Sequence, residues 1–296
     1  MSGVRIAQDG SPLDTLTRAP SVGAGPRLWW LGQAGFALES AGTRILIDPY
    51  LSDSLAAKYR GRLFPHTRLH PAPIDPATIT GVSAVLHTHA HTDHLDPWTI
   101  RDLLDRNSPR FVAPEARRDV ALERGIPEKS LIGAVAGDRI GLPGVTVDVV
   151  PAAHETREHD QQGRDAFLGY VVDLGGVRVY HSGDCVPYPE QAELLRDLRV
   201  DVALLPINGR DAYRTGNGVP GNFTVEEAVA LCEEVGIAAL VGHHFGLFDF
   251  NTIDPDDARS RLRRSAHRLD WIIPDLGAGY RLETASAAIE GGAVHA

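Results

Sequence analysis

The sequence lacks the features that mark secreted and membrane-spanning proteins. Only two of its 296 residues, Cys185 and Cys232, are cysteines. Two cysteines cannot support a disulfide framework, which favours a reducing compartment. No window approaches the ~20 apolar residues of a membrane span, and the N-terminus has no long apolar run typical of a signal peptide. We therefore expect a cytoplasmic protein without a membrane span.

Positive charge is also scarce. The formal net charge is -10 and the sequence pI is about 5.7. Because nucleic acids are normally bound by a basic face, this balance argues against a nucleic-acid partner. A local basic pocket in an acidic protein still permits a small anionic substrate. The hydrophobic content of 43% is that of an ordinary globular domain, so composition alone does not select a function.

The chain shows no interdomain linker and no internal repeat. Residues 1–26 mix Ser, Thr, Gly and Pro with isolated apolar residues, which predicts a poorly ordered arm or a strap over the body. We expect residues 27–296 to form a single domain. The oligomeric state stays open, and a homo-oligomer is compatible with the sequence.

Short apolar runs between turns fill the first third of the chain, and strands alternate with helices after it. Gly175-Gly176 predicts a hairpin between two apolar runs. Thr224, Glu227 and Gly236 predict a helix over 224–235 with a capping box and a glycine stop. Further strands are expected at 28–31, 36–38, 44–47, 82–87, 111–113, 145–150, 202–205, 238–241 and 271–273, and further helices at 98–107, 117–125 and 255–266. The pattern favours an α/β fold with two packed sheets and helices outside.

The run His89-Ala90-His91-Thr92-Asp93-His94 follows the apolar residues 82–87 directly. Imidazole nitrogen and carboxylate oxygen are ligands of borderline metals such as zinc. A turn after a strand can direct these four side chains into one space, and its small neighbours let the backbone turn tightly. A histidine-rich surface loop without function is the alternative. The preceding strand and the acidic partner favour a metal site.

This run resembles the signature of the metallo-β-lactamase superfamily. Three later positions complete the pattern in order, each behind an apolar run: His154, Asp184 and His244. Four further segments resemble the L-ascorbate-6-phosphate lactonase-like branch: Trp30-Leu31-Gly32-Gln33-Ala34-Gly35-Phe36, Ile47-Asp48-Pro49-Tyr50-Leu51-Ser52-Asp53-Ser54, Pro206-Ile207-Asn208-Gly209-Arg210-Asp211 and Gly221-Asn222. The resemblance covers roughly residues 27–282 and implies a four-layer αββα sandwich.

The resemblance also implies two divalent metal ions, zinc or manganese. The first would be held by His89, His91 and His154. The second would be held by Asp93, His94 and His244, with Asp184 as the bridge. A hydroxide between the two ions would be the nucleophile. Asp93 and Asp184 are therefore the candidate catalytic residues, and Asp48 is expected to orient a ligand from behind.

One position departs from the family pattern. Gly242 stands where a proline is usual, and His243 precedes His244. His244 is the favoured ligand because His-Phe-Gly aligns with the usual His-aromatic-Gly, and His243 is the alternative. We interpret His87, His181 and both cysteines as structural.

The leading function is hydrolysis of a lactone or ester in a small anionic substrate. Five residues of a polar, glycine-rich stretch are candidate substrate contacts, with a solvated loop as the alternative: Asn208, Arg210, Asp211, Arg214 and Asn222. The two arginines could clamp an anionic group. A phosphodiesterase, including a phospholipase D-like enzyme, and an iron-dependent oxidoreductase on the same fold are the rival functions.

Overall fold

The computed structural model describes residues 3–284. In this range the first sheet contains, in spatial order, β1 (Val4–Pro12), β15 (Ala278–Thr284), β2 (Arg27–Gly32), β3 (Gly35–Ser40), β4 (Thr43–Ile47), β5 (Val82–Leu86), β6 (Arg110–Pro114) and β7 (Leu131–Ala134). The second contains β14 (Asp270–Ile272), β13 (Ala239–His243), β12 (Val202–Pro206), β11 (Val177–His181), β10 (Leu168–Leu174), β9 (Val145–Pro151) and β8 (Arg139–Leu142). The helices are α1 (Ser54–Lys58), α2 (Pro97–Leu104), α3 (Arg118–Glu123), α4 (Gln191–Asp197), α5 (Ala212–Gly216), α6 (Val225–Val235) and α7 (Pro255–Ser265).

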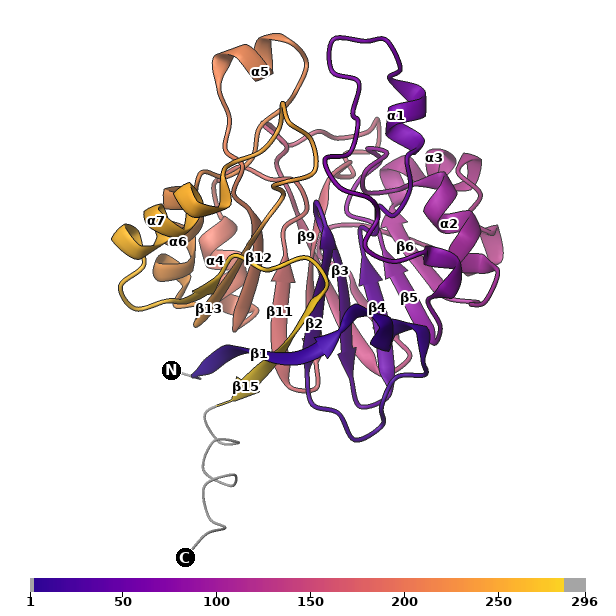
Figure 1. The fold of residues 1–296 in the computed structure, drawn as a ribbon, viewed down its shortest axis with the longest axis horizontal. Coiled ribbons are helices and arrows are strands. Elements are labelled where there is room, and N and C mark those ends of the chain that lie inside the picture. The colour runs from indigo at the N-terminus through magenta and orange to yellow at the C-terminus, as the bar shows by residue number, and fades with distance from the viewer. Residues whose placement is uncertain (1–2, 285–296) are drawn as a thin grey trace, which may run out of the picture.

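The two sheets pack face to face between two layers of helices (Figure 1). Helices α2 and α3 cover the outer face of the first sheet, and α4, α6 and α7 cover that of the second. The expected αββα sandwich is confirmed. Among the described residues, no helix is both long and apolar enough to cross a membrane.

Both faces of the first sheet are buried, as strand β4 illustrates. Ile45 and Ile47 join the core between the sheets, whereas Leu46 joins the core beneath α2 and α3. Successive side chains of a strand point to opposite faces, so a strand covered on both sides has an unbroken apolar run. Each such side chain contributes roughly 1.5–3 kcal/mol by leaving water.

Two local predictions are confirmed in detail. The Thr224 hydroxyl accepts from the Glu227 amide at 3.2 Å, and the Glu227 carboxylate accepts from the Thr224 amide at 2.9 Å, which closes the capping box of α6. Gly175 and Gly176 both have positive φ and connect β10 to β11. That conformation matches the right-handed twist of the flanking strands.

Of the two alternatives for residues 1–26, a poorly ordered arm was wrong for the part that forms β1. Val4–Pro12 pairs antiparallel with β15, a strand that the sequence analysis missed. The two segments lie at opposite ends of the chain, so neither shows its partner in the local sequence. The expected arm (1–26) includes residues 1–2, and the expected single domain (27–296) includes residues 285–296. Both stretches lie outside the described residues.

A buried arginine ties the N-terminal segment to the first sheet. Arg44 is fully buried and its Nη2 lies 2.7 Å from Glu39 Oε2. Its Nη1 donates to the carbonyls of Leu16 at 2.9 Å, Arg18 at 2.8 Å and Thr80. A buried charge is tolerated only when its hydrogen bonds are satisfied, and here three carbonyls of loops outside the sheet satisfy it.

We predict that Arg44→Ala lowers the free energy of unfolding by about 3–5 kcal/mol, because it leaves the Glu39 carboxylate buried without its partner. Urea unfolding followed by circular dichroism measures the change. Arg281→Ala is the matched control: its pair with Glu283 is about half exposed, and we expect a change within about 0.5 kcal/mol. Equal losses in the two variants would contradict the role of Arg44.

Candidate metal centre

Four segments of the chain bring imidazoles and carboxylates to one end of the two sheets. The loop after β5 carries four of them: His89, His91, Asp93 and His94. His154 follows β9, Asp184 follows β11 and His244 follows β13. Strand ends therefore position every one of these side chains.

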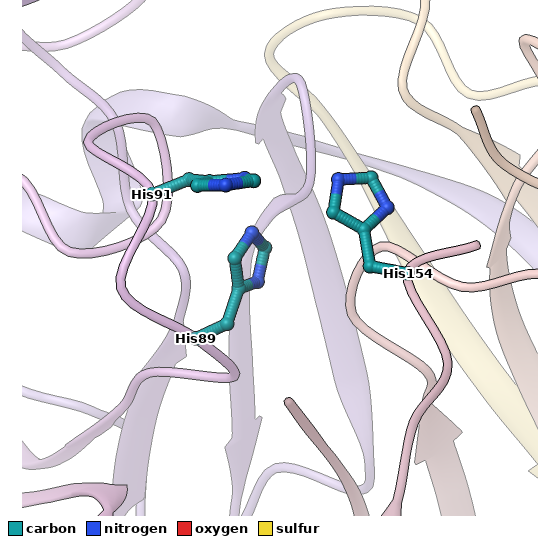
Figure 2. A group of neighbouring side chains, drawn as sticks. All are labelled: His89, His91 and His154. Atoms are coloured by element: carbon teal, nitrogen blue, oxygen red, sulfur yellow. The ribbon is translucent and has the colours of Figure 1, made fainter. Parts of the chain in front are cut away.

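The seven side chains fall into three overlapping groups, each with ligand atoms within 4.8 Å of one another. The groups are His89 with His91 and His154, His89 with His94 and Asp184, and Asp93 with His94 and His244. Figure 2 shows the rings of the first group turned toward a common space. All seven residues that the resemblance assigned to two metals are thus brought together.

Asp184 lies at the centre of the cluster. Its Oδ1 is 3.3 Å from His94 Nε2, and its Oδ2 is 3.1 Å from His244 Nε2 and 3.8 Å from His154 Nε2. One carboxylate therefore faces histidines from both expected ligand sets. This is the position that a bridging ligand would occupy.

Several buried atoms of the cluster have no hydrogen-bond partner. They include His89 Nε2, and also His94 Nε2 and Asp184 Oδ1, which lie 3.3 Å apart without the alignment of a hydrogen bond. Leaving a buried polar atom unpaired costs about 1–3 kcal/mol of folding free energy. These atoms belong to side chains whose possible ligand atoms lie within 4.8 Å of one another. Divalent cations accept lone pairs from imidazole and carboxylate, so the donor set fits them.

Electrostatics favour the metal-binding protonation states of His89, His154 and Asp184. His94 differs: burial lowers its pKa, but the carboxylates of Asp184 and Asp48 outweigh burial and raise that pKa well above its usual value. Burial lowers the pKa of His89 well below its usual value and that of His154 to about 4, so both rings are neutral at pH 7. Burial alone would raise the pKa of Asp184, but His244 and His94 outweigh it and hold that pKa well below its usual range. Neutral imidazole and ionised carboxylate are the forms that bind a metal.

Asp48 orients His94 from behind. Its Oδ2 accepts from His94 Nδ1 at 2.7 Å and from the Thr88 hydroxyl at 2.6 Å, and its Oδ1 accepts from the Thr88 amide at 2.8 Å. With Nδ1 occupied, Nε2 of His94 is directed toward Asp184. A carboxylate behind a ligating histidine fixes its tautomer and raises its basicity.

Comparison with known proteins identifies the family. Residues 43–245 match the family described as Beta-lactamase superfamily domain. The chain belongs to this superfamily. The match does not single out the lactonase-like branch.

Relatives within the superfamily cover nearly the whole chain. A metal-dependent hydrolase of Aeropyrum pernix is 28% identical over 272 residues, covering 88% of this chain and 99% of that protein. One of Archaeoglobus fulgidus is 29% identical over 259 residues, covering 86% and 98%. The structure of a metallo hydrolase from Ignicoccus hospitalis has a TM-score of 0.60 at 22% identity, covering 88% and 97%, and supports the fold.

Gln33 is a member of the site that the sequence analysis did not single out. Its Nε2 lies 3.1 Å from Asp93 Oδ2 and 3.1 Å from His244 Nε2, and its carbonyl accepts from the His244 amide at 3.0 Å. It thus links the β2–β3 turn to two members of the expected second set. The only available signal was its place in the run 30–36 that resembles the family.

The geometry favours His244 over His243. The His243 ring packs 5.0 Å from His181 and 5.4 Å from Phe36, between centroids, whereas His244 faces Asp184. At the expected proline position, a Cβ added to Gly242 would lie 2.8 Å from Ile207 Cδ1 and 3.0 Å from Ile273 Cδ1, so these two side chains would have to shift to admit a proline.

The other residues interpreted as structural have ordinary contacts. His181 Nε2 lies 2.8 Å from the Ala34 carbonyl, and His87 Nδ1 lies 2.7 Å from the His94 carbonyl. Burial raises the pKa of the Cys185 thiol to about 12, so it stays protonated. Cys232 is likewise fully buried in the core.

A cavity of about 760 Å³ opens over the centre. Its walls come from the α1 segment, the histidine loop and two later segments: Leu55, Lys58, Tyr59, Arg62, Leu63, Phe64, His66, Ala90, His91, Thr92, Asp93, His154, Asp184, Asn217, Gly218, Val219, Pro220, Phe248, Phe250 and Asn251. This volume suits a ligand larger than a few atoms.

None of the five expected substrate residues is among these lining residues of the described chain. Arg210 pairs with Glu227 at 2.6 Å, and Arg214 pairs with Asp211 at 2.6 Å. Both guanidinium groups are therefore already engaged, and Asp211 also caps α5 by accepting from the Arg214 amide. The two arginines that were expected to bind an anionic substrate group are thus paired with carboxylates of the protein itself.

The two asparagines form a buried relay toward Asp184. Asn222 Oδ1 accepts from the Cys185 amide at 2.9 Å, and its Nδ2 donates to Asn208 Oδ1 at 3.1 Å. Asn208 Nδ2 then donates to Asn251 Oδ1 at 2.7 Å. This chain of hydrogen bonds connects the amide of Cys185, next to Asp184, with Asn251 in the cavity wall.

We predict that Asp48→Asn weakens zinc binding by about 10–100-fold, because the substitution removes the charge behind His94. Competition with a chromophoric chelator measures the affinity. Asp105→Asn, at the exposed end of α2, makes the same chemical change far from the cluster and should leave the affinity unchanged. A folded Asp48→Asn protein with wild-type affinity would contradict the orienting role.

Proposed function

We propose that this protein is a metal-dependent hydrolase that uses two divalent ions, zinc or manganese, to cleave a lactone or ester bond in a small anionic substrate. The observation that carries the proposal is the central position of Asp184 among histidines of both expected ligand sets. The naming of full-length relatives as metal-dependent hydrolases supports it.

In the proposed site, His89, His91 and His154 would hold the first ion, Asp93, His94 and His244 would hold the second, and Asp184 would be shared. When bound, such cations polarise an acyl or phosphoryl oxygen and lower the pKa of water. The contacts of Asp48 and Gln33 restrain the side chains that would be the ligands.

Hydrolysis of a lactone adds water across the acyl carbon–oxygen bond. The hydroxyl group of water goes to the acyl carbon, and its proton goes to the departing alkoxide. Asp93 and Asp184 are the carboxylates that line the cavity. Asp93 is the proposed proton carrier, since it stands at the edge of the cluster while Asp184 lies among three imidazoles.

Metal loading and one ligand substitution test the proposal. We expect protein reconstituted with zinc or manganese to bind two ions per chain and to open simple lactones. His89→Ala should reduce kcat/KM by at least about 100-fold, because it removes a ligand of the ion that activates water. Elemental analysis and a panel of lactones with bis(p-nitrophenyl) phosphate supply the measurements.

His267→Ala is the control, because His267 is exposed in the turn between α7 and β14 and belongs to none of the ligand groups. It should keep full activity. Metal-loaded wild type and His89→Ala that are equally inert across the panel would refute the hydrolase proposal. Turnover of the phosphodiester alone would favour the phosphodiesterase, and purification with iron alone would favour redox chemistry.

A further inference from the structure

One wall of the cavity over the metal centre is aromatic. The rings of Tyr59, Phe64, His66, Phe248 and Phe250 all line it. Phe64 and Phe250 stack with centroids 4.6 Å apart, and Tyr59 and His66 stack at 4.3 Å. Such a group of aromatic rings makes one side of the cavity apolar, and a small polar sugar derivative would leave that side unused.

The charged residues that line the cavity away from the metal centre are both cationic. They are Lys58 and Arg62, from the end of α1 and the turn after it. In a chain with a net charge of -10, neither forms an ion pair with a carboxylate anywhere within residues 3–284. By contrast, Arg210 and Arg214 are paired with acidic residues.

Lys58 lies beside the metal centre. Its Nζ is 3.5 Å from the Thr92 hydroxyl, and Thr92 precedes Asp93 in the chain. The same ammonium lies 5.2 Å from the centroid of the Tyr59 ring, within the range of a cation–π contact. The cation therefore stands at the junction between the aromatic wall and the proposed reaction centre.

We propose that the cavity selects an amphipathic anionic substrate: a lactone or ester with an aromatic body that packs on this wall and an anionic group that pairs with Lys58 and Arg62. This inference rests on the proposed hydrolase function and names its substrate class. Aromatic stacking supplies the packing, and the two unpaired cations supply the charge recognition. A volume of about 760 Å³ accommodates a bicyclic substrate.

Four lactones separate the two halves of this proposal. They are dihydrocoumarin, its 6-carboxy derivative, δ-valerolactone and a carboxy-δ-valerolactone, each assayed by pH-stat with the zinc-loaded protein. We expect the carboxylated aromatic lactone to have the highest kcat/KM, about tenfold above its neutral counterpart. A phosphorylated dihydrocoumarin distinguishes a preference for phosphate from one for carboxylate.

Matched variants identify the residues responsible. Arg62→Gln and Lys58→Gln should each remove most of the advantage of the carboxylated over the neutral lactones, measured as the ratio of their two kcat/KM values. Arg60→Gln removes the same charge from an exposed arginine of the same segment that lies outside the cavity lining, and should change neither. Phe250→Leu should reduce the preference for aromatic over aliphatic lactones without changing the anion preference.

Binding of a ketone that cannot be hydrolysed provides an independent measurement. We expect carboxy-2-tetralone to bind more tightly than 2-tetralone by calorimetry, and Arg62→Gln to abolish the difference. This result in a protein that hydrolyses no lactone would uphold the recognition of an aromatic anion and refute the proposed lactone hydrolysis. Lactone hydrolysis with no anion preference, or an equal loss on neutral and carboxylated lactones in Arg62→Gln, would overturn the substrate class alone. Failure of both binding and hydrolysis would overturn both.

Discussion

The structure depends on one constraint: seven imidazole and carboxylate side chains are held close together while buried atoms among them lack hydrogen-bond partners. Burying polar atoms in this way is costly, and the fold tolerates it because the groups compensate one another. Asp184 lies among three histidines, and Asp48 accepts from His94 on the opposite side of that ring. The same convergence that opposes folding makes the site complementary to cations.

Backbone strain gathers around the same centre. Asp48, Gln33 and His244 have φ values of 46°, 50° and 66°, a region that side-chain-bearing residues seldom adopt. Each such conformation costs of order 1–3 kcal/mol and persists only where the surroundings determine it. The surroundings here are the ends of buried strands, and the Trp30 ring, stacked on Phe245, donates to the Gln33 carbonyl at 3.0 Å. Core packing thus holds the groups that orient the expected metal ligands.

The two sides of the cavity have different physical characters. The floor is built from hydrogen-bonded loops at strand ends, whereas the walls come from the segment around α1 and the segments near 217–220 and 248–251. The loops that carry α1 and α5 rise beyond the ends of the sheets (Figure 1). Such a floor suits chemistry that is common to the superfamily, and wall loops are where substrate recognition varies between enzymes. Arg210 is paired with Glu227 and lies outside the cavity lining, whereas the cations Lys58 and Arg62 line the cavity.

The sequence by itself determined the αββα architecture and the candidate ligands. Apolar runs precede His89, His154, Asp184 and His244. Each run predicts a buried strand, and the end of that strand places the following side chain at the edge of a sheet. The pairing of β1 with β15 was decided only in the tertiary structure, since each strand takes its partner from the far end of the chain. The same holds for Gln33 and for the stacked rings of Phe64 and Phe250. Their contacts join segments whose local patterns say nothing of one another, and the pairing of Arg210 with Glu227 likewise depends on a helix that follows it.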